Sequence, residues 1–230
     1  MGQRLNPAGS YRSGRLRYRL KIDSVEFVRS AAGPGDLPDA ALPELSMVGR
    51  SNVGKSSLIN ALMRRQVART SAAPGKTRLI NLYKVTTART GPFYLVDLPG
   101  FGYARKEGHA EFERLAAMYF RRQGDVPVGV LLALDARHPG MENDLATLQW
   151  LRQRGFGPAE PGALLLIVVT KIDKVSRNAR AKALDRFERL CEQPVLAVSA
   201  ATGEGLEDLW KPMISWVASQ ATNRTPRPRP

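Results

Sequence analysis

The chain has 230 residues, of which 43% are hydrophobic, so one α/β domain with a sizeable core fits its length. Its longest apolar run, Ala163–Val169, is too short to span a bilayer, and no signal-peptide pattern precedes the first strand pattern. The single cysteine, Cys191, excludes an intrachain disulfide and a multi-cysteine metal site, and it agrees with a reducing compartment.

The net charge of +14 is concentrated at the two ends of the chain. Residues 1–21 contain six cations and residues 222–230 contain three, and neither end contains an acid, so 26 cations face 21 acids in between. Basic arms usually contact polyanions such as nucleic acid. A solvated, solubilising tail and an organelle transit peptide at the N-terminal end are the alternative interpretations.

The composition divides the chain into three parts. Residues 1–21 are rich in Arg, Gly, Ser and Tyr without an apolar period, which predicts a basic disordered arm. Residues 221–230 form an Arg/Pro-rich tail that should be extended. The globular domain is therefore expected at 22–220.

Short apolar runs within this domain alternate with helical patterns. The runs that predict strands are Val25–Val28, Leu45–Val48, Leu79–Val85, Phe93–Val96, Val128–Leu134, Leu164–Val169 and Val195–Val198. Several are apolar at successive positions, as in a parallel sheet covered on both faces. Apolar stripes predict helices over 112–120 and 206–217, and Pro212 should kink or split the second one.

The linker Thr86–Pro92 is too short for a crossover helix, so the strands on either side of it should pair antiparallel. The predicted fold class is a three-layer α/β fold whose sheet is mostly parallel, with one antiparallel strand pair.

A phosphate-binding motif, G-x-x-x-x-G-K-[ST], lies between the second predicted strand and a helix start. Its residues are Gly49, Arg50, Ser51, Asn52, Val53, Gly54, Lys55 and Ser56. Glycines let the backbone N–H groups wrap a phosphate, and the helix N-terminus adds a positive partial charge. We expect Lys55 to reach the β- and γ-phosphates and Ser56 to bind Mg²⁺ through its hydroxyl. In this context a chance glycine-rich turn is the weaker reading.

The next strand ends in a D-x-x-G pattern, formed by Asp97, Leu98, Pro99 and Gly100. An Asp at the end of an apolar strand can hold Mg²⁺ directly or through water, and the Gly100 N–H can face a γ-phosphate. By itself this pattern is more typical of a turn at a strand end. Its place after the phosphate loop, at the end of the antiparallel partner strand, is the order that a GTPase requires.

Thr77 lies between these two motifs, in a stretch whose preceding residues 69–76 have the composition of a flexible loop. It can offer a second hydroxyl to Mg²⁺ and its N–H to the γ-phosphate, so the loop should order with GTP and loosen with GDP. The alternative is a threonine that merely starts a strand. The neighbouring residues expected to contact the nucleotide are Gly75, Lys76, Arg78 and Leu79.

The sixth predicted strand leads into Thr170, Lys171, Ile172 and Asp173. Asp173 can accept hydrogen bonds from guanine N1–H and the 2-amino group, which adenine lacks. The Lys171 stem can lie along the base. Taken alone, Asp173 would be assigned to helix capping, but after the two phosphate motifs base recognition is favoured. The last predicted strand leads from Val198 into Ser199 and Ala200, whose backbone can contact the guanine oxygen.

With these elements in order, the sequence resembles a Ras-like P-loop GTPase of the TrmE-Era-EngA-EngB-septin-like class, and more narrowly the EngB/YihA/YsxC family. The resemblance covers about residues 24–217. The segments that carry it are Gly49–Asn60, Ala68–Ser71, Pro74–Thr77, Asp97–Ala104 and Thr170–Lys174. Asp135–Pro139, Asp144 and Trp150–Leu151 also resemble this family and are not general GTPase features.

The resemblance implies slow Mg²⁺-dependent GTP hydrolysis that cycles a cytoplasmic, monomeric switch between GTP and GDP. It further implies a role in assembly of the large ribosomal subunit, binding to that subunit or its rRNA precursors, and a requirement in normal cell division and septation. The catalytic set is expected to be Lys55, Thr77 and Gly100, and the Mg²⁺ ligands Ser56 and Thr77. An alternative is a nucleotide-gated RNA-binding module whose hydrolysis is incidental, and a third is a P-loop protein that uses ATP.

Two departures affect the chemistry that the resemblance implies. Thr170 stands where most GTPases have Asn, although this family commonly has Thr, and Phe101 replaces a more usual Tyr. Phe101 also stands where signalling GTPases have a water-orienting Gln, so intrinsic hydrolysis should be slow and should need help. Asn52 matches a phosphate-loop Asn that binds K⁺ in related GTPases, or it only shapes the loop. Arg105 and Lys106 suit RNA contact, or form a solvated loop edge.

Overall fold

The computed structural model describes residues 21–38, 42–68, 79–101, 106–121, 126–157, 160 and 162–222, and only the backbone of 106–112 and 221–222. Within this part of the chain the strands are β1 (Ile22–Ala31), β2 (Glu44–Gly49), β3 (Ile80–Thr87), β4 (Gly91–Asp97), β5 (Val128–Asp135), β6 (Leu164–Thr170) and β7 (Val195–Ala197). The α-helices are α1 (Lys55–Met63), α2 (Lys106–Phe120), α3 (Glu142–Arg152), α4 (Arg177–Cys191) and α5 (Leu206–Thr222).

The strands form one sheet in the order β1-β3-β4-β2-β5-β6-β7. The predicted antiparallel pairing of β3 with β4 is confirmed, with Leu82 opposite Val96. Because β3 is the strand that opposes the others, it also pairs antiparallel with β1, a pairing that the sequence analysis did not include. The pairings of β2 with β4 and β5, of β5 with β6, and of β6 with β7 are parallel. The predicted mostly parallel α/β fold is confirmed.

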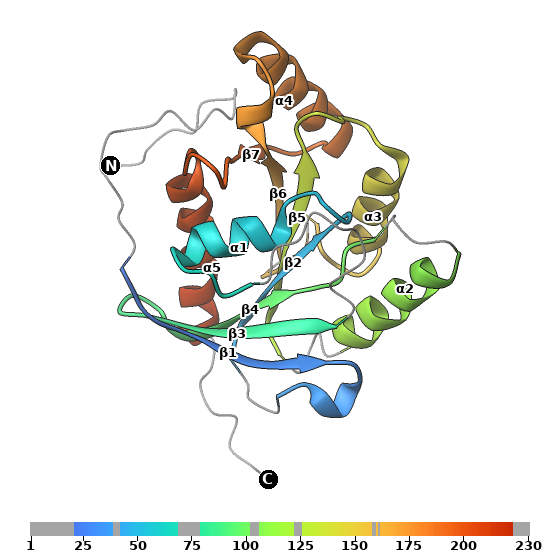
Figure 1. Ribbon diagram of the computed structural model, residues 1–230. Helices are drawn as coiled ribbons and strands as arrows, with labels where there is room; N and C mark the ends of the chain where they lie inside the picture. Colours follow the sequence, from blue (N-terminus) through green and yellow to red (C-terminus); the bar gives the residue numbers. More distant parts are fainter. Residues whose placement is uncertain are drawn as a thin grey trace.

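Helices cover both faces of the sheet, which explains why several strands are apolar at successive positions (Figure 1). On one face α1 and α5 pack through Leu58, Leu62 and Met213. On the other face α2, α3 and α4 pack through residues such as Tyr119 and Phe187. One apolar cluster lies between the sheet and each helical layer, so the structure has the predicted three layers.

The carboxyl ends of the parallel strands place polar residues at one edge of the sheet. Parallel register puts Asp135 at the end of β5 opposite Thr170 at the end of β6. Met47, near the end of β2, is opposite Asp97 at the end of β4. In open α/β sheets ligands bind at this edge, so the fold gathers the predicted motifs where a site is expected.

Pro212 does not split α5, contrary to one of the two outcomes predicted for it, since the helix runs from Leu206 to Thr222 with the proline inside. The missing N–H of Pro212 would have bonded to the carbonyl of Asp208, which lies on an exposed turn where water can serve instead. Leu209 and Met213 on either side of it are fully buried. This burial holds the two turns in line.

Most of the basic arm (1–20) and most of the Arg/Pro tail (223–230) lie outside the described residues. Among the residues that are described, we find no helix with the length and apolar character of a membrane span.

Candidate nucleotide-binding site

The phosphate loop follows β2 directly and is shaped by its two glycines. Gly49 has φ +153°, and a Cβ there would lie 2.7 Å from the carbonyl oxygen of Ala133 on β5. Gly54, directly before the first residue of α1, has φ +110°, a conformation that would be strained for a residue with a side chain. The loop therefore wraps tightly against β5 and presents the N-terminus of α1.

Lys55, the first residue of α1, is buried with 7% of its surface exposed. Its Nζ donates to the carbonyl oxygens of Gly49 at 2.8 Å and Arg50 at 3.2 Å, so the ammonium lies inside the loop that it follows. Burial lowers the pKa of Lys55 to about 8, against the opposing effect of the nearby Asp97 carboxylate. A phosphate bound in the loop would give this buried lysine an anionic partner and would stabilise its charged form.

Asp97 and Ser56 form a pair of oxygen ligands suited to a small divalent cation. The Ser56 hydroxyl donates to Asp97 Oδ2 at 3.1 Å. Asp97 Oδ1 is buried and has no hydrogen-bond partner within the described part of the chain. Burial raises the pKa of Asp97, although Lys55 and Ser56 act to lower it. An orphaned buried carboxylate oxygen beside a hydroxyl fits Mg²⁺, which takes oxygen ligands and retains waters.

The loop after β4 is held directly against the phosphate loop. The Ser51 N–H donates to the Phe101 carbonyl at 2.9 Å, and the Ser51 hydroxyl donates to the Gly100 carbonyl at 3.1 Å. A Cβ on Gly100 would lie 2.6 Å from Ser51 Cα, so only glycine allows this approach. Leu98, Pro99 and Phe101 are buried. The D-x-x-G residues thus lie beside the place where a γ-phosphate would enter.

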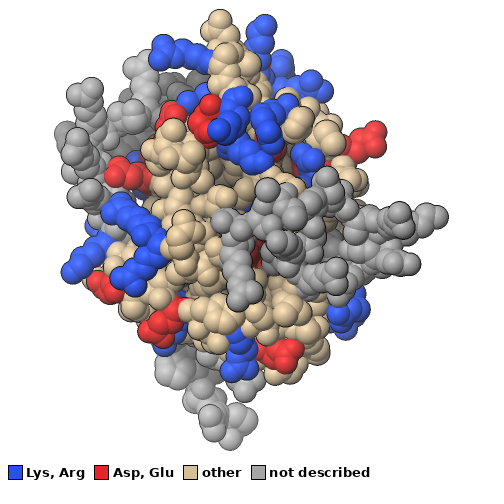
Figure 2. All heavy atoms as spheres, in the orientation of Figure 1, with Lys and Arg blue, Asp and Glu red and all other residues tan. Residues whose placement is uncertain are grey.

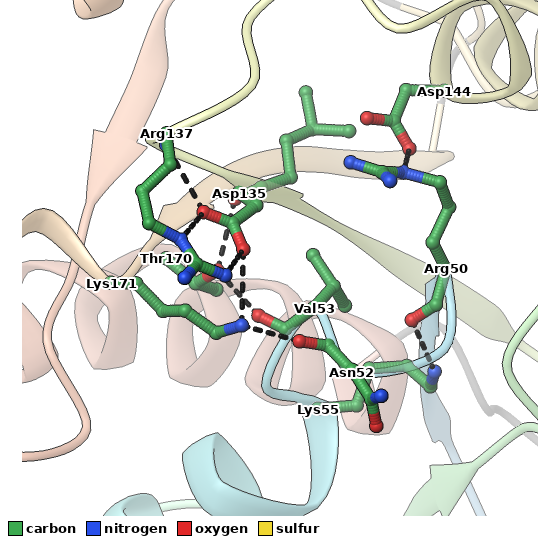
Figure 3. Close-up of polar contacts among 10 residues, drawn as sticks. Arg50, Asn52, Val53, Lys55, Asp135, Arg137, Asp144, Thr170 and Lys171 are labelled. Atoms are coloured by element: carbon green, nitrogen blue, oxygen red, sulfur yellow. Dashed lines mark hydrogen bonds and ion pairs between the residues drawn. The ribbon is translucent and has the colours of Figure 1, made fainter. Parts of the chain in front are cut away.

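The loop after β6 is tied to the phosphate loop from the other side (Figure 3). The Thr170 hydroxyl lies 2.7 Å from the Val53 carbonyl and 3.0 Å from the Leu134 carbonyl. The Lys171 Nζ donates to Asp135 Oδ2 at 3.0 Å and also to the Asn52 carbonyl. Thr170, which stands where most GTPases have Asn, therefore links the loop after β6 to the phosphate-loop backbone through its hydroxyl.

Asp173 is fixed by a serine from the loop after β7. The Ser199 hydroxyl donates to Asp173 Oδ1 at 2.7 Å, and this hydrogen bond lowers the pKa of Asp173. Asp173 Oδ2 lies 3.6 Å from Lys174 Nζ. The carboxylate is therefore held in its charged, accepting form. Ile172 is buried in the core, so only its backbone is available to a ligand.

A cavity of about 530 Å³, a size that accommodates a small-molecule ligand, lies between the start of α1 and the loops after β6 and β7. The residues around it include Gly54, Thr170, Lys171, Asp173, Val198 and Ala200, together with Ser57, Leu58, Asn60 and Ala61 of α1. The structure thus brings together the phosphate loop, Asp97 and the two predicted base-contacting loops. The predicted residues Gly75, Lys76, Thr77 and Arg78 lie outside the described residues, whereas Leu79 is 38% exposed just before β3.

Two carboxylates that were not among the predicted nucleotide or metal contacts also hold residues of the site. One binds the loop after β6 and the other binds the phosphate loop. Asp135 at the end of β5 binds Lys171 and Arg137, and Asp144 in α3 accepts from Arg50 Nε at 2.8 Å (Figure 3). Burial would raise the pKa of Asp135, but hydrogen bonds from Arg137 and Lys171 lower it to about 2. For Asp135 a signal was available, because it is a polar residue that ends an apolar strand, as Asp97 and Thr170 are.

A glycine-rich phosphate loop between β2 and α1, followed by D-x-x-G after β4 and an Asp after β6, defines the class of P-loop GTPases. The family model described as "50S ribosome-binding GTPase" matches residues 44–171. A probable GTP-binding protein EngB from Pelotomaculum thermopropionicum is 38% identical over 205 residues, which are 86% of this chain and 98% of that protein. One from Thermotoga sp. strain RQ2 is 40% identical over 194 residues, 82% and 93% of the two chains. The chain belongs to the EngB family of GTPases.

Solved structures agree in fold. The crystal structure of a probable GTP-binding protein EngB has a TM-score of 0.56 at 20% identity, covering 76% of this chain and 99% of that one. A point variant of Aquifex aeolicus Era bound to GDP and aluminium fluoride has a TM-score of 0.60 at 23% identity, covering 77% of this chain and 57% of that one. These likenesses confirm the G-domain fold, and membership of the EngB family makes the chain a GTP-hydrolysing enzyme.

Proposed function

We propose that this GTPase is a switch in assembly of the large ribosomal subunit, loaded with GTP and Mg²⁺ and reset by slow hydrolysis. The observation that carries the nucleotide part is the cavity in which Asp173, Lys171 and the start of α1 face the same space. A guanine base at Asp173 would leave its phosphates at the N-terminus of α1. There the backbone N–H groups and the Lys55 ammonium favour anions.

The proposed catalytic roles belong to Lys55, Thr77 and Gly100. Lys55 would neutralise charge on the β- and γ-phosphates, and the N–H groups of Thr77 and Gly100 would contact the γ-phosphate. Ser56 and Thr77 would bind Mg²⁺ through their hydroxyls, with Asp97 holding it through water. When bound, Mg²⁺ supplies charge stabilisation to the departing phosphate.

Comparison of GTP with ATP tests the nucleotide assignment. Asp173 is poised to accept two hydrogen bonds that adenine does not offer, so GTP should bind far more tightly than ATP. Equal affinities in a direct titration would support the alternative of an ATP-using P-loop protein.

The ribosomal part of the proposal rests on family membership and on charge. Figure 2 shows many of the described cations in the upper part of the face drawn, with others at its left and lower edges. The basic residues of α4 include Arg177, Lys182 and Arg186. Basic surfaces of this kind bind rRNA through its phosphates. The basic arm at 1–21 and the tail at 221–230 would add to this attraction, and we propose that both flank the G domain at 22–220.

Co-sedimentation with purified large ribosomal subunits tests this part at near-physiological salt. Pelleting with a non-hydrolysable GTP analogue but not with GDP is the expected result, because the loops at Thr77 and Gly100 would respond to the γ-phosphate. Equal pelleting with both nucleotides would favour RNA binding by the tails and leave the switch without its partner. We also propose that the protein is needed for normal cell division and septation, because both would suffer when assembly of the large subunit fails.

The second candidate, a nucleotide-gated RNA-binding module with incidental hydrolysis, is favoured only by the basic surface. The two proposals differ in whether ribosomal particles accelerate hydrolysis. We expect acceleration, since buried Phe101 offers no group that can orient water. Deleting residues 1–21 should also flatten the dependence of log K on log salt if the arginines of the arm contact phosphates.

Potassium is proposed as a further activator through Asn52, which is exposed and adopts φ +60° in the phosphate loop. Its side-chain oxygen could hold K⁺ against the phosphates, where a positive charge helps hydrolysis. Turnover should be faster in KCl than in NaCl at equal ionic strength. Identical rates would leave Asn52 with a role in loop shape alone. We further propose that the protein is a cytoplasmic monomer.

A further inference from the structure

The carboxylate of Asp135 lies at the centre of the contacts that join the base end of the site to the phosphate loop (Figure 3). Its side chain is 4% exposed and all its contacts are with cations or N–H groups. Oδ1 accepts from the Arg137 N–H at 3.0 Å and Nε at 2.9 Å, whereas Oδ2 accepts from Arg137 Nη2 at 2.7 Å and Lys171 Nζ at 3.0 Å. Both oxygens are thus fully engaged.

The Asp135 carboxylate holds Lys171 where its side chain lines the cavity. Its Nζ also donates to the Asn52 carbonyl, and its Cε lies 3.6 Å from where a Cβ on Gly54 would be. The stem therefore crosses the phosphate loop and lines the cavity at the same time. A free lysine side chain has several rotatable bonds and would lose that freedom on binding a ligand. A stem that is already fixed avoids this cost.

We propose that Asp135 is a positioning residue for guanine-nucleotide binding: it anchors the Lys171 ammonium so that the lysine stem forms a preformed wall of the base cavity. Arg137 orients the carboxylate from the far side but does not reach the cavity. This inference rests on the proposed function, because it assigns the base to the cavity beside Asp173.

A purely structural role for Asp135 is the competing explanation. Its contacts with Arg137, and the His138 N–H bond to its carbonyl at 3.0 Å, also shape the turn after β5. The two explanations differ in one respect. A positioning residue acts on the nucleotide only through Lys171, whereas a residue that shapes the turn would act whether Lys171 is present or not.

A double-mutant cycle on GDP binding separates them, using the full chain with a fluorescent methylanthraniloyl-GDP probe at fixed Mg²⁺. Asp135→Asn should weaken binding about 10-fold, because a charge-assisted hydrogen bond is lost. In a Lys171→Ala background the same change should weaken binding less than about twofold. The loss should be equal for GDP and IDP, since the stem covers the ring face and not the 2-amino edge.

Two further variants serve as controls. Asp185→Asn makes the same change at an exposed aspartate of α4 that pairs with Arg189 at 2.6 Å outside the cavity, so its affinity should stay within about twofold of the parent. Lys171→Met keeps the stem but removes the anchored ammonium, and it should lose as much affinity as Asp135→Asn. This variant decides the question even where Asp135→Asn folds poorly.

An equal loss from Asp135→Asn with and without Lys171, or no loss at all, would overturn the proposal. So would a Lys171→Met protein that binds GDP as the parent does. Failure of the proposed function would give another result, because the parent protein itself would then not bind GDP.

Discussion

The two ends of the nucleotide-binding site differ in how far the protein satisfies its own charges. At the phosphate end, burial shifts the pKa of Lys55 down and that of Asp97 up, so both charged forms are disfavoured. Asp97 Oδ1 also lacks a partner among the described residues. At the base end, Asp173 is held by Ser199 and Lys171 by Asp135, so both charged groups already have partners.

This difference implies a division of labour. Base recognition benefits from groups that are fixed before the ligand arrives, because ordering them on binding would cost affinity. The phosphate end is incomplete until a phosphate meets Lys55 and a cation meets Asp97, so ligand binding relieves its burial cost. Such an end is suited to report whether a γ-phosphate and its metal are present.

The largest test of the comparison is Asp173→Asn. An amide cannot accept both guanine hydrogen bonds and presents its own N–H groups to donors, so GTP affinity should fall about 100-fold or more. The preference for GTP over ATP should disappear with it. Competition titrations with both nucleotides measure the two effects together.

Asp185→Asn provides a matched control for this change. Asp185 is an exposed aspartate of α4 that pairs with Arg189 at 2.6 Å, outside the cavity. Its substitution should leave nucleotide selectivity unchanged. Intact GTP preference in Asp173→Asn would mean that the base end does not read guanine through this carboxylate.

Asp97→Asn tests the incomplete end and should act in opposite directions on stability and on catalysis. Burial disfavours the charged Asp97 more than Lys55 and Ser56 favour it, so removing this charge should stabilise the nucleotide-free protein by about 1 kcal/mol, a rise in Tm of about 2–4 °C. Mg²⁺-dependent GTP hydrolysis should fall about 100-fold, because the cation loses its carboxylate. Calorimetry without nucleotide and phosphate-release assays measure the two.

Ser56→Ala distinguishes the two halves of this prediction. It removes the hydroxyl that donates to Asp97 Oδ2 and leaves the carboxylate in place. Hydrolysis should fall, but the apo protein should lose stability. A drop in apo stability for Asp97→Asn would show that Asp97 is already satisfied and that the contrast between the two ends is wrong.

The sequence predicted the fold and the main site residues well because their signals are local. The phosphate loop needs glycines at fixed spacing, and strands covered on both faces are apolar at successive positions. The links between the loops depend on register instead. Asp135 meets Lys171, 36 positions away, only because β5 and β6 pair in parallel with Asp135 opposite Thr170. Spacing along the chain carries no trace of that pairing.

Tertiary packing decided the other points that local patterns did not predict. Pro212 remains inside α5 because buried residues on either side hold the helix in line. Ser199 was expected to contribute its backbone, but its hydroxyl holds Asp173 because the loops after β6 and β7 lie side by side. In each case a distant segment determined what the residue does.

The pH dependence of GDP affinity gives a third, smaller test of the phosphate end. With a pKa of about 8 in the empty site, Lys55 is protonated below that pH both before and after binding, so affinity should be flat there. Above pH 8 binding requires proton uptake, because the phosphates raise the pKa of Lys55. Affinity should then fall by up to about tenfold per pH unit.

Lys55→Arg isolates this effect, since arginine stays charged throughout the range. Deprotonation of the guanine base at higher pH is common to both proteins and cancels in their ratio. A ratio that does not change between pH 7 and pH 9 would contradict a destabilised ammonium in the empty loop.

The smallest expected effect concerns Ser199→Ala at the base end. Losing the hydroxyl that donates to Asp173 should weaken GDP binding about fivefold, the size of one net hydrogen bond. The pKa of Asp173 should rise toward its ordinary value, so acidification should weaken binding at a higher pH than in the parent. GDP titrations from pH 7 down to pH 4 measure both changes.

Ser30→Ala is the control for this change. Ser30 lies on β1, the strand at the opposite edge of the sheet from β7, and its exposed hydroxyl donates to Asn81 Oδ1 at 2.6 Å. It removes one serine hydroxyl bonded to a side-chain oxygen and should leave GDP affinity unchanged. A larger loss for Ser199→Ala than for Asp173→Asn would mean that Ser199 contacts the nucleotide directly, and the base end would then owe its order to the ligand after all.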